Sequence, residues 1–289
     1  MTRQTQQQTT LVTGGTSKTG RRVVERLQAR GLPARVGSRS GNPAFDWDDH
    51  STWAPALEGV GSVYISHHLD ALPGAAETVG SFAELAVANG IRKHVLVGGR
   101  GEPESERVEE AARNSGAELT IVRSTWFAQN FSEGGFLDFV MAGEVTLPAG
   151  DTPEPFVDVD DIADVAVAAL TEEGHEGELY EVTGPRLLTF EQAVEEIARA
   201  TGREIPYAHV SMDEFESLLV EQEVPAEVIW LLTYLFGEVL DGRNAHLTDG
   251  VQRALGREPK DFADFARDAV AAGAWSAPSI LIGGETAAH

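Results

Sequence analysis

The chain has 289 residues, of which 42% are hydrophobic and 24% charged, as in ordinary soluble globular proteins with a full core. Because it contains no cysteine, disulfides, thiolate catalysis and cysteine-ligated metal centres are excluded. Its net charge of −24 argues against a general nucleic-acid binder, which needs a basic face.

Short apolar runs alternate with amphipathic stretches through the first 125 residues. Strands are predicted at 9–13, 34–38, 43–46, 62–66, 94–97 and 119–123. Helices are predicted at 18–30, 51–57, 74–88 and 104–114. Alternation of this kind builds βαβ units, so we expect a doubly wound α/β fold with a parallel sheet and helices on both faces.

Helices dominate the second half of the chain. They are predicted at 136–142, 160–170, 188–201, 212–222, 225–240 and 247–272, with short strands at 144–147, 179–182 and 204–209. Thr189 and Gln192 form the pattern of a capping box at the start of the helix over 188–201. The apolar run 228–240 predicts cap core, with a dimer interface or a substrate lid as the alternative. It is too short and too interrupted to span a bilayer.

A glycine-rich turn connects the first predicted strand to the first predicted helix. It consists of Thr13, Gly14, Gly15, Thr16, Ser17, Lys18, Thr19 and Gly20. This context is typical of a dinucleotide-binding fingerprint. Gly14 would make the tight turn, Gly20 would let helix and strand pack closely, and the free N–H groups of the helix would receive a pyrophosphate. Ser17 stands at the place of the middle glycine, which is tolerable only with a negative φ.

The end of the second predicted strand indicates which nucleotide is bound. An NAD site normally has an acid here, which accepts hydrogen bonds from the ribose 2′-hydroxyl, and this segment has none. Arg39, flanked by Ser38 and Ser40, would instead bind a 2′-phosphate. The predicted cofactor is therefore NADPH, and the alternative is an arginine that is simply exposed on the surface.

Basic residues are concentrated at the N-terminal end. Residues 1–40 hold eight basic residues against the single acid Glu25, so this segment carries +7. Such an excess on an acidic protein indicates either an anionic ligand or a solvated basic helix face. Residues 1–10 are polar and lack the apolar run of a signal peptide, so the expected compartment is the cytoplasm, with no membrane partner.

Three segments together resemble the NmrA-like branch of the atypical short-chain dehydrogenases/reductases. They are TLVTGGTSKTGRRVVERL at 10–27, RSTWFAQNF at 123–131 and PFVDVDDIADVAVAAL at 155–170. The resemblance covers most of residues 9–275 and implies a Rossmann core that binds NAD(P)(H). It implies a function among NADPH-dependent quinone reductases, reductases of natural-product pathways and redox-sensing regulators. Some similar proteins in aromatic polyketide pathways assist oxygenation of quinone-like substrates.

The same resemblance implies further site residues by position. Asp46 and Trp47 would lie near the adenine. Ser66, His67 and His68 would lie beside the riboses. The residues implied near the nicotinamide are Ser124, Thr125, Trp126 and Phe127. We expect residues 1–185 to form mainly the Rossmann domain, 186–275 mainly a helical substrate-binding cap, and 276–289 a flexible tail.

The usual proton donor of short-chain dehydrogenases is missing. That donor is a tyrosine with a lysine four residues later, which lowers the tyrosine pKa. The tyrosines are Tyr64, Tyr180, Tyr207 and Tyr234, and the residues four positions on are His68, Gly184, Ser211 and Glu238. The sequence therefore does not support ketone reduction by the usual route. A quinone accepts hydride more readily, and positioning it against the nicotinamide can suffice.

Candidate substrate-side residues follow the sixth predicted strand. Trp126, Phe127 and Phe131 would form a flat aromatic pocket in which Asn130 hydrogen-bonds an oxygen, or else they pack the core. His67 is a candidate for proton transfer, since adjacent strand residues point to opposite faces and at most one of His67 and His68 can face the site. No metal site is expected. The acids Asp158, Asp160, Asp161 and Asp164 are explained by the start of a helix.

Three functions therefore remain open from the sequence. The first is an NADPH-dependent reductase of a quinone or related small aromatic substrate, acting as a monomer or a homodimer. The second is an oxygenation catalyst, with the outcome of a hydroxylase or monooxygenase, that reduces a quinone so that it reacts with O₂. The third is an NADP(H)-sensing regulator without turnover.

Overall fold

A parallel six-stranded sheet forms the centre of the computed structural model, which describes residues 8–67 and 70–276. His68 and residues 277–289 of the predicted tail lie outside the described residues. The strand order is β2-β1-β3-β4-β5-β7, and every neighbouring pair is parallel. The strands are β1 (Thr9–Thr13), β2 (Ala34–Gly37), β3 (Val60–Ile65), β4 (Lys93–Gly99), β5 (Glu118–Ser124) and β7 (Leu179–Val182). The order reverses at β1 and β3, where doubly wound folds bind ligands at the carboxyl ends of the strands.

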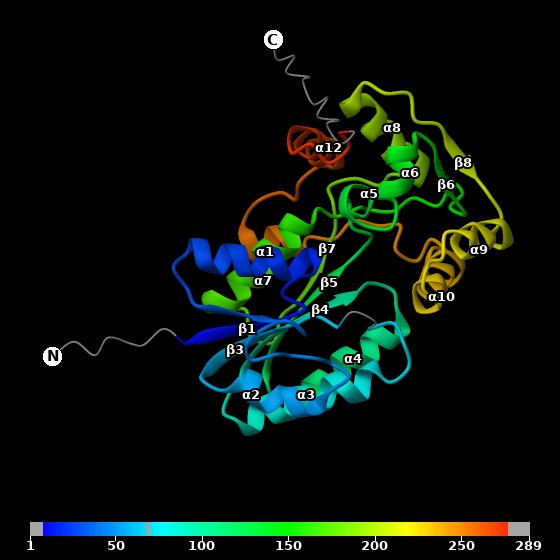
Figure 1. The fold of residues 1–289 in the computed structure, drawn as a ribbon. Helices are drawn as coiled ribbons and strands as arrows, with labels where there is room; N and C mark the ends of the chain where they lie inside the picture. The colour runs from blue at the N-terminus through cyan, green and yellow to red at the C-terminus, as the bar shows by residue number, and fades with distance from the viewer. Residues whose placement is uncertain (1–7, 68–69, 277–289) are drawn as a thin grey trace, which may run out of the picture.

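Helices cover both faces of this sheet (Figure 1). One face carries α1 (Lys18–Ala29), α7 (Val159–Thr171) and α11 (Gly250–Leu255). The other carries α2 (Trp53–Leu57), α3 (Ala75–Ala88) and α4 (Pro103–Asn114). Each layer closes its own hydrophobic cluster against the sheet, so the predicted doubly wound α/β architecture is confirmed.

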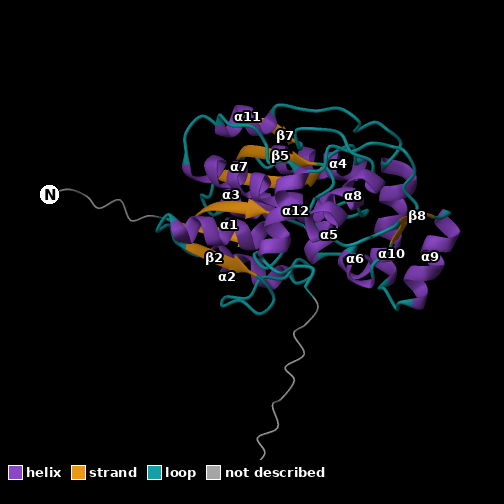
Figure 2. Cartoon of the chain, turned by 90° about the horizontal axis from the view of Figure 1, so that it is seen from above, coloured by secondary structure: helices purple, strands orange, loops and turns teal. Residues whose placement is uncertain are grey.

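A mainly helical cap lies beside the sheet (Figure 2). Its helices are α5 (Asn130–Glu133), α6 (Leu137–Ala142), α8 (Phe190–Thr201), α9 (Met212–Glu221), α10 (Ala226–Tyr234), the π-helical turn η2 (Leu235–Val239) and α12 (Phe262–Ala271). A two-stranded parallel sheet joins β6 (Val145–Leu147) to β8 (Tyr207–His209). The hydrophobic cluster of the cap draws on residues 126–156 as well as 188–275, so two distant segments build one core.

Local signals placed most elements correctly. The capping box of α8 is present, with Thr189 and Gln192 bonding each other's backbone. The predicted strand at 43–46 is wrong. Pro43 has no N–H for a ladder, and the N–H of Phe45 bonds the Ser38 carbonyl locally at 2.9 Å. The side chain of Phe45 is buried against Trp47 and Phe82, which explains the apolar character of this loop.

Two helix predictions need correction. The single helix over 247–272 is wrong, because Gly256 adopts a φ of 66° and ends α11, and Pro259 follows before α12 begins. The cap core predicted at 228–240 is confirmed for Phe236 and Leu240, which are buried in the cap cluster. It holds only in part for α10, which has no fully buried residue and packs against that cluster through residues such as Ile229 and Leu232. Val228 and Trp230 are 36% and 41% exposed. Among the helices that the structure describes, none combines the length and the hydrophobicity that spanning a bilayer requires.

Candidate functional site

The glycine turn between β1 and α1 has the geometry that its sequence predicts. Gly14 adopts a φ of 59°, and its carbonyl accepts a hydrogen bond from the N–H of Ser17 at 2.8 Å. A Cβ atom at Gly20 would overlap the carbonyl oxygen of Gly14. The predicted tight turn is therefore confirmed, and at Gly20 the helix approaches the turn itself too closely for a side chain, so both features depend on glycine.

Ser17 fits the position of the middle glycine because its φ is −71°. Its hydroxyl accepts a hydrogen bond from the N–H of Gly20 at 3.1 Å and so caps α1. Thr16 is exposed at the turn, whereas Thr19 is buried. The first turn of α1 contains no acid, so the positive end of the helix dipole is not opposed from within the helix.

Lys18 and Asn130, predicted for different roles, lie together above the turn. The Nζ atom of Lys18 donates a hydrogen bond to Oδ1 of Asn130 at 3.1 Å. Burial lowers the pKa of Lys18; Glu133 opposes this shift, and Arg22 and Arg21 add to it. This hydrogen bond therefore joins the start of α5 to the N-terminal end of α1.

The remaining basic residues of α1 are paired within the protein. Arg22 binds Glu133 at 2.6 Å and Asp160 at 3.0 Å, and Arg26 binds Asp164 at 2.6 Å. The further pairs of the same helix are Arg21 with Glu133 and Arg30 with Glu172. Acids of α5 and α7, and Glu172 directly after α7, therefore balance most of this charge within the protein, although Arg21 and Arg30 remain 41% and 47% exposed. The anionic ligand predicted for the basic segment stays a prediction.

Arg39 differs from these arginines. It is exposed just beyond β2 and makes no hydrogen bond or ion pair with residues that the structure describes. The hydroxyls of Ser38 and Ser40 lie 3.4 Å apart on either side of it in the sequence. By contrast, Arg35 donates to the carbonyls of Ala56 and Glu58 at 2.6 and 2.8 Å. A ligand could therefore bind the Arg39 guanidinium without first breaking a hydrogen bond or ion pair to another described residue.

The carboxyl end of β3 brings together three predicted residues. The indole N–H of Trp47 donates to the Ser66 carbonyl at 3.2 Å, and the ring of Trp47 lies 5.0 Å from that of His67. A Cβ at Gly14 would lie 3.4 Å from Ser66, so this group borders the glycine turn. The carboxylate of Asp46, the residue before Trp47, accepts a hydrogen bond from the N–H of Asp48 at 3.2 Å.

The aromatic residues after β5 pack the cap. Trp126 is 9% exposed and contacts Phe136, Phe190 and Phe236, with ring centroids 6.0, 5.1 and 4.9 Å away. Phe131 is fully buried in the same cluster. This environment favours the core-packing interpretation of Trp126 over a substrate-facing one. Ser124, at the end of β5, is also buried, and its hydroxyl donates to the Gly98 carbonyl at 3.2 Å.

Two acids that the sequence analysis missed lie after β3 and β4. Asp70 accepts a hydrogen bond from the Ser105 hydroxyl at 3.2 Å, and Ser105 in turn accepts the Gly99 N–H at 2.9 Å. Burial raises the pKa of Asp70 well above its usual range. Burial, assisted by the charge of Asp70, also raises the pKa of Glu102. Position at the ends of neighbouring parallel strands was the only available signal for this pair.

A third missed acid is Glu154, which is fully buried. It accepts a hydrogen bond from the Thr125 hydroxyl at 2.7 Å. Burial raises its pKa to about 7, although the Thr125 hydrogen bond and the charge of Arg100 act in the opposite direction. Thr125 and Glu154 are 29 positions apart in the sequence, and no motif links them, so the pairing is visible only in the fold.

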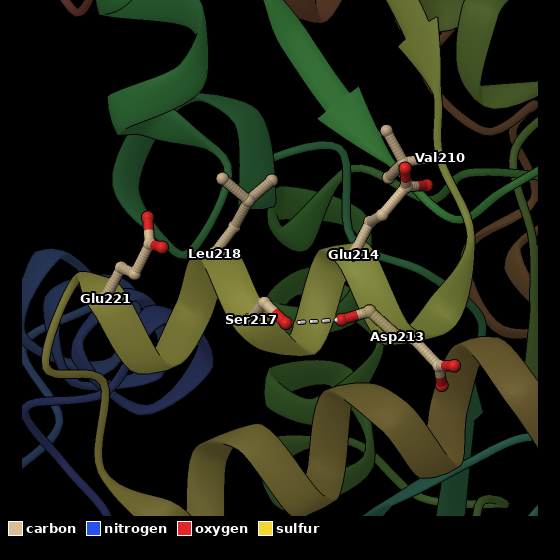
Figure 3. A pocket seen from close by; sticks show the side chains of 6 residues that line it. All are labelled: Val210, Asp213, Glu214, Ser217, Leu218 and Glu221. Atoms are coloured by element: carbon tan, nitrogen blue, oxygen red, sulfur yellow. Dashed lines mark hydrogen bonds between the residues drawn. The ribbon is translucent and has the colours of Figure 1, made fainter.

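Figure 3 shows a hollow beside α9 whose lining contains none of the residues predicted for the site. The side chains that line it are Val210, Asp213, Glu214, Ser217, Leu218 and Glu221. The Ser217 hydroxyl donates to the Asp213 carbonyl at 2.8 Å. Three carboxylates would repel a phosphate, so this hollow does not suit a nucleotide. Among the described residues, no group of three or more histidine or acidic side chains could hold a metal ion.

Two similar proteins are related along nearly their whole length. Agroclavine dehydrogenase of Claviceps fusiformis is 32% identical, over 90% of this chain and 96% of that protein. NAD(P)H azoreductase of Xenophilus azovorans is 27% identical, over 91% of this chain and 98% of that protein.

Solved structures share the fold. Triphenylmethane reductase of Citrobacter sp. with NADP(H) has a TM-score of 0.73 at 19% identity, over 90% of this chain and 99% of that one. The quinone oxidoreductase QOR2 of Escherichia coli with NADPH has a TM-score of 0.72 at 20% identity, with the same coverage. The negative transcriptional regulator NmrA with NADP has a TM-score of 0.67 at 17% identity, over 91% and 95%.

The model of the NmrA-like family matches residues 104–265, more than half of the chain. The match takes in the segments at 123–131 and 155–170 on which the predicted resemblance partly rests. With the 32% identical relative that spans nine-tenths of the sequence, it confirms that prediction. The chain belongs to the NmrA-like family.

Proposed function

We propose that this protein is an NADPH-dependent oxidoreductase that delivers hydride to a quinone or a similarly electron-poor aromatic substrate. The observation that carries this proposal is the turn after β1, in which Gly14 has a positive φ and Gly20 has no room for a side chain. That geometry leaves the N-terminal end of α1 open to a pyrophosphate.

The side chains around the turn fit the remainder of NADPH. Arg39, Ser38 and Ser40 suit the 2′-phosphate, because a guanidinium and two hydroxyls form charge-assisted hydrogen bonds with it. The other proposed cofactor contacts are Gly14, Thr16, Ser17, Lys18, Thr19, Gly20, Asp46, Trp47, Ser66 and Ser124. When bound, the nicotinamide supplies the hydride, and the protein positions the acceptor.

The proposed acceptor follows from what the described site offers. A ketone needs a protein acid of the tyrosine type, and no tyrosine here has a lysine four residues later. An electron-poor aromatic ring takes hydride more readily. Relatives named azoreductase and quinone oxidoreductase support this class. We place the acceptor near Asn130 and His67, with residues 1–185 mainly holding the cofactor and 186–275 mainly closing over the substrate.

Turnover with a panel of polycyclic quinones tests the proposal. NADPH should be oxidised in strictly anaerobic buffer with formation of hydroquinone, and simple ketones should give no turnover. The same assay in air, followed by mass spectrometry, checks for a gain of one oxygen atom, which would indicate the oxygenation function instead. Tight NADPH binding without oxidation across the whole panel would contradict the proposal and favour a sensor.

Cofactor choice provides a second test. We expect NADPH to bind at least about tenfold more tightly than NADH, which corresponds to about 1.4 kcal/mol. Arg39→Ala should remove that preference, because Arg39 would pair with the 2′-phosphate. Arg35→Ala is the matched control, since the Arg35 guanidinium is committed to the carbonyls of Ala56 and Glu58. Titration of both cofactors by calorimetry decides the matter, and equal affinities in the wild type would refute the assignment of Arg39.

A further inference from the structure

The loop between β6 and α7 holds a carboxyl group inside the molecule. Glu154 is 0% exposed, and its backbone N–H and carbonyl pair with those of Leu188 at 2.8 and 2.9 Å. These two hydrogen bonds fix the residue in place. Burial raises the free energy of a charged carboxylate. A carboxyl group in so enclosed a position is therefore either neutral or stabilised by specific partners.

The two oxygens of Glu154 have different surroundings. Oε2 accepts the Thr125 hydroxyl at 2.7 Å, whereas Oε1 is buried without a hydrogen-bond partner among the residues that the structure describes. Thr125 directly follows β5, at the edge of the sheet where doubly wound folds bind ligands. A rigid, incompletely satisfied carboxyl group behind such an edge is typical of a functional residue.

Charged groups from two neighbouring elements act on Glu154. Arg100, in the loop after β4, favours its carboxylate form, and Asp241, after η2, opposes it. Arg100 is not free to pair fully with Glu154, because its Nε lies 3.5 Å from Glu181. The other described groups that bind the Arg100 side chain are Asn244 and His246. Burial outweighs these influences and raises the pKa of Glu154 to about 7, so both protonation states occur near neutral pH.

We propose that Thr125 and Glu154 form a proton relay to the acceptor: the Thr125 hydroxyl protonates the reduced substrate, and the Glu154 carboxyl replaces that proton. This inference rests on the proposed reductase function. The quinone gains a hydride from NADPH and a proton from Thr125, and becomes a hydroquinone while NADPH becomes NADP⁺. Glu154 is left as a carboxylate and regains one proton from solvent. The 2.7 Å contact serves both directions, because a carboxylic acid donates and a carboxylate accepts.

An infrared titration tests the proton-carrying group without any turnover. The wild-type spectrum minus that of Glu154→Gln should contain one carboxylic acid band that disappears with a midpoint near pH 7. Glu102→Gln is the matched control, because it removes another acid with a raised pKa at the same sheet edge and should leave this difference band in place. A Glu154 side chain that is fully ionised at pH 5 would overturn the relay.

Quinone turnover then tests the role in the reaction. In the wild type, kcat should fall as the pH rises through about 7, because the protonated form of Glu154 is the one that acts. Glu154→Gln should lower kcat at pH 6 by roughly 100-fold, the lower end of the usual contribution of a general acid, and should flatten the profile. Thr125→Val, which removes the hydroxyl, should lower kcat and flatten the pH profile in the same way. Thr125→Ser, which keeps a hydroxyl, should retain the activity that Thr125→Val loses. NADPH affinity should stay unchanged in all three variants.

The outcomes separate the relay from the function on which it rests. A wild-type protein that oxidises no NADPH with any quinone would refute the reductase function and the relay with it. A wild-type protein that is active, with an unchanged pH profile in Glu154→Gln, would refute the relay alone. If the pH dependence of kcat were lost in Glu102→Gln but kept in Glu154→Gln, the pair of Asp70 and Glu102 would be the source of the transferred proton. That result would also overturn the relay.

Discussion

Replacement of Trp126 by alanine should destabilise the protein by about 3–5 kcal/mol, the usual cost of removing a buried tryptophan. The side chain is 9% exposed and lies among Phe136, Phe190 and Phe236. These rings come from three separate segments of the cap, so the cavity left by the substitution would loosen their common core. Chemical denaturation of wild type and variant, followed by circular dichroism, measures the difference.

Trp230→Ala is the matched control, because it removes the same side chain from the same cap. Trp230 is 41% exposed and, among the residues that the structure describes, stacks only on Tyr234, with ring centroids 5.2 Å apart. Its loss should cost well under half of the value for Trp126. If Trp126→Ala were as stable as the wild type and changed only the KM for a quinone, the core-packing interpretation would be wrong and Trp126 would line the acceptor site.

The fold was predictable wherever its signals are local. Each strand of the main sheet is a short apolar run, and each is followed by a turn signal or a helix pattern within a few residues, so all six were predicted. Errors arose where the composition of a segment was typical of a strand or helix but its backbone did not form one continuous element. The run around Phe45 is apolar because it packs on Trp47, not because it pairs with a strand. Residues 247–272 have helical periodicity, yet Gly256 interrupts it.

In the candidate site, too, the features formed by neighbouring residues in the chain were predictable and the long-range contacts were not. The glycine turn, with Ser17 and Gly20, is contiguous in the chain and could be predicted in detail. Pairings over long distances could not. Arg22 meets Glu133 across 111 residues, and this pairing accounts for part of the positive charge of the N-terminal segment. Thr125 meets Glu154 only because the β6–α7 loop folds back over the end of β5, and no spacing rule anticipates that contact.

Gly14→Val should weaken NADPH binding by at least about 100-fold, which corresponds to about 2.7 kcal/mol. The turn requires a φ of 59° at this position, and a Cβ there would already contact Ser66 at 3.4 Å. A β-branched side chain would therefore either occupy the space above the turn or force the backbone out of the left-handed region. Both changes would remove the surface on which the pyrophosphate is proposed to lie. Calorimetric titration with NADPH measures the loss.

Gly31→Val separates backbone strain from loss of the site. Gly31 ends the turn after α1 with a φ of 72°, and nothing lies within 4 Å of a Cβ built there. Both valine variants should lose about 1–2 kcal/mol of folding free energy through the left-handed conformation, and both should remain folded. NADPH affinity should be normal in Gly31→Val and lost in Gly14→Val, because only the latter residue faces the start of α1. Retained affinity in a folded Gly14→Val protein would show that the nucleotide binds elsewhere.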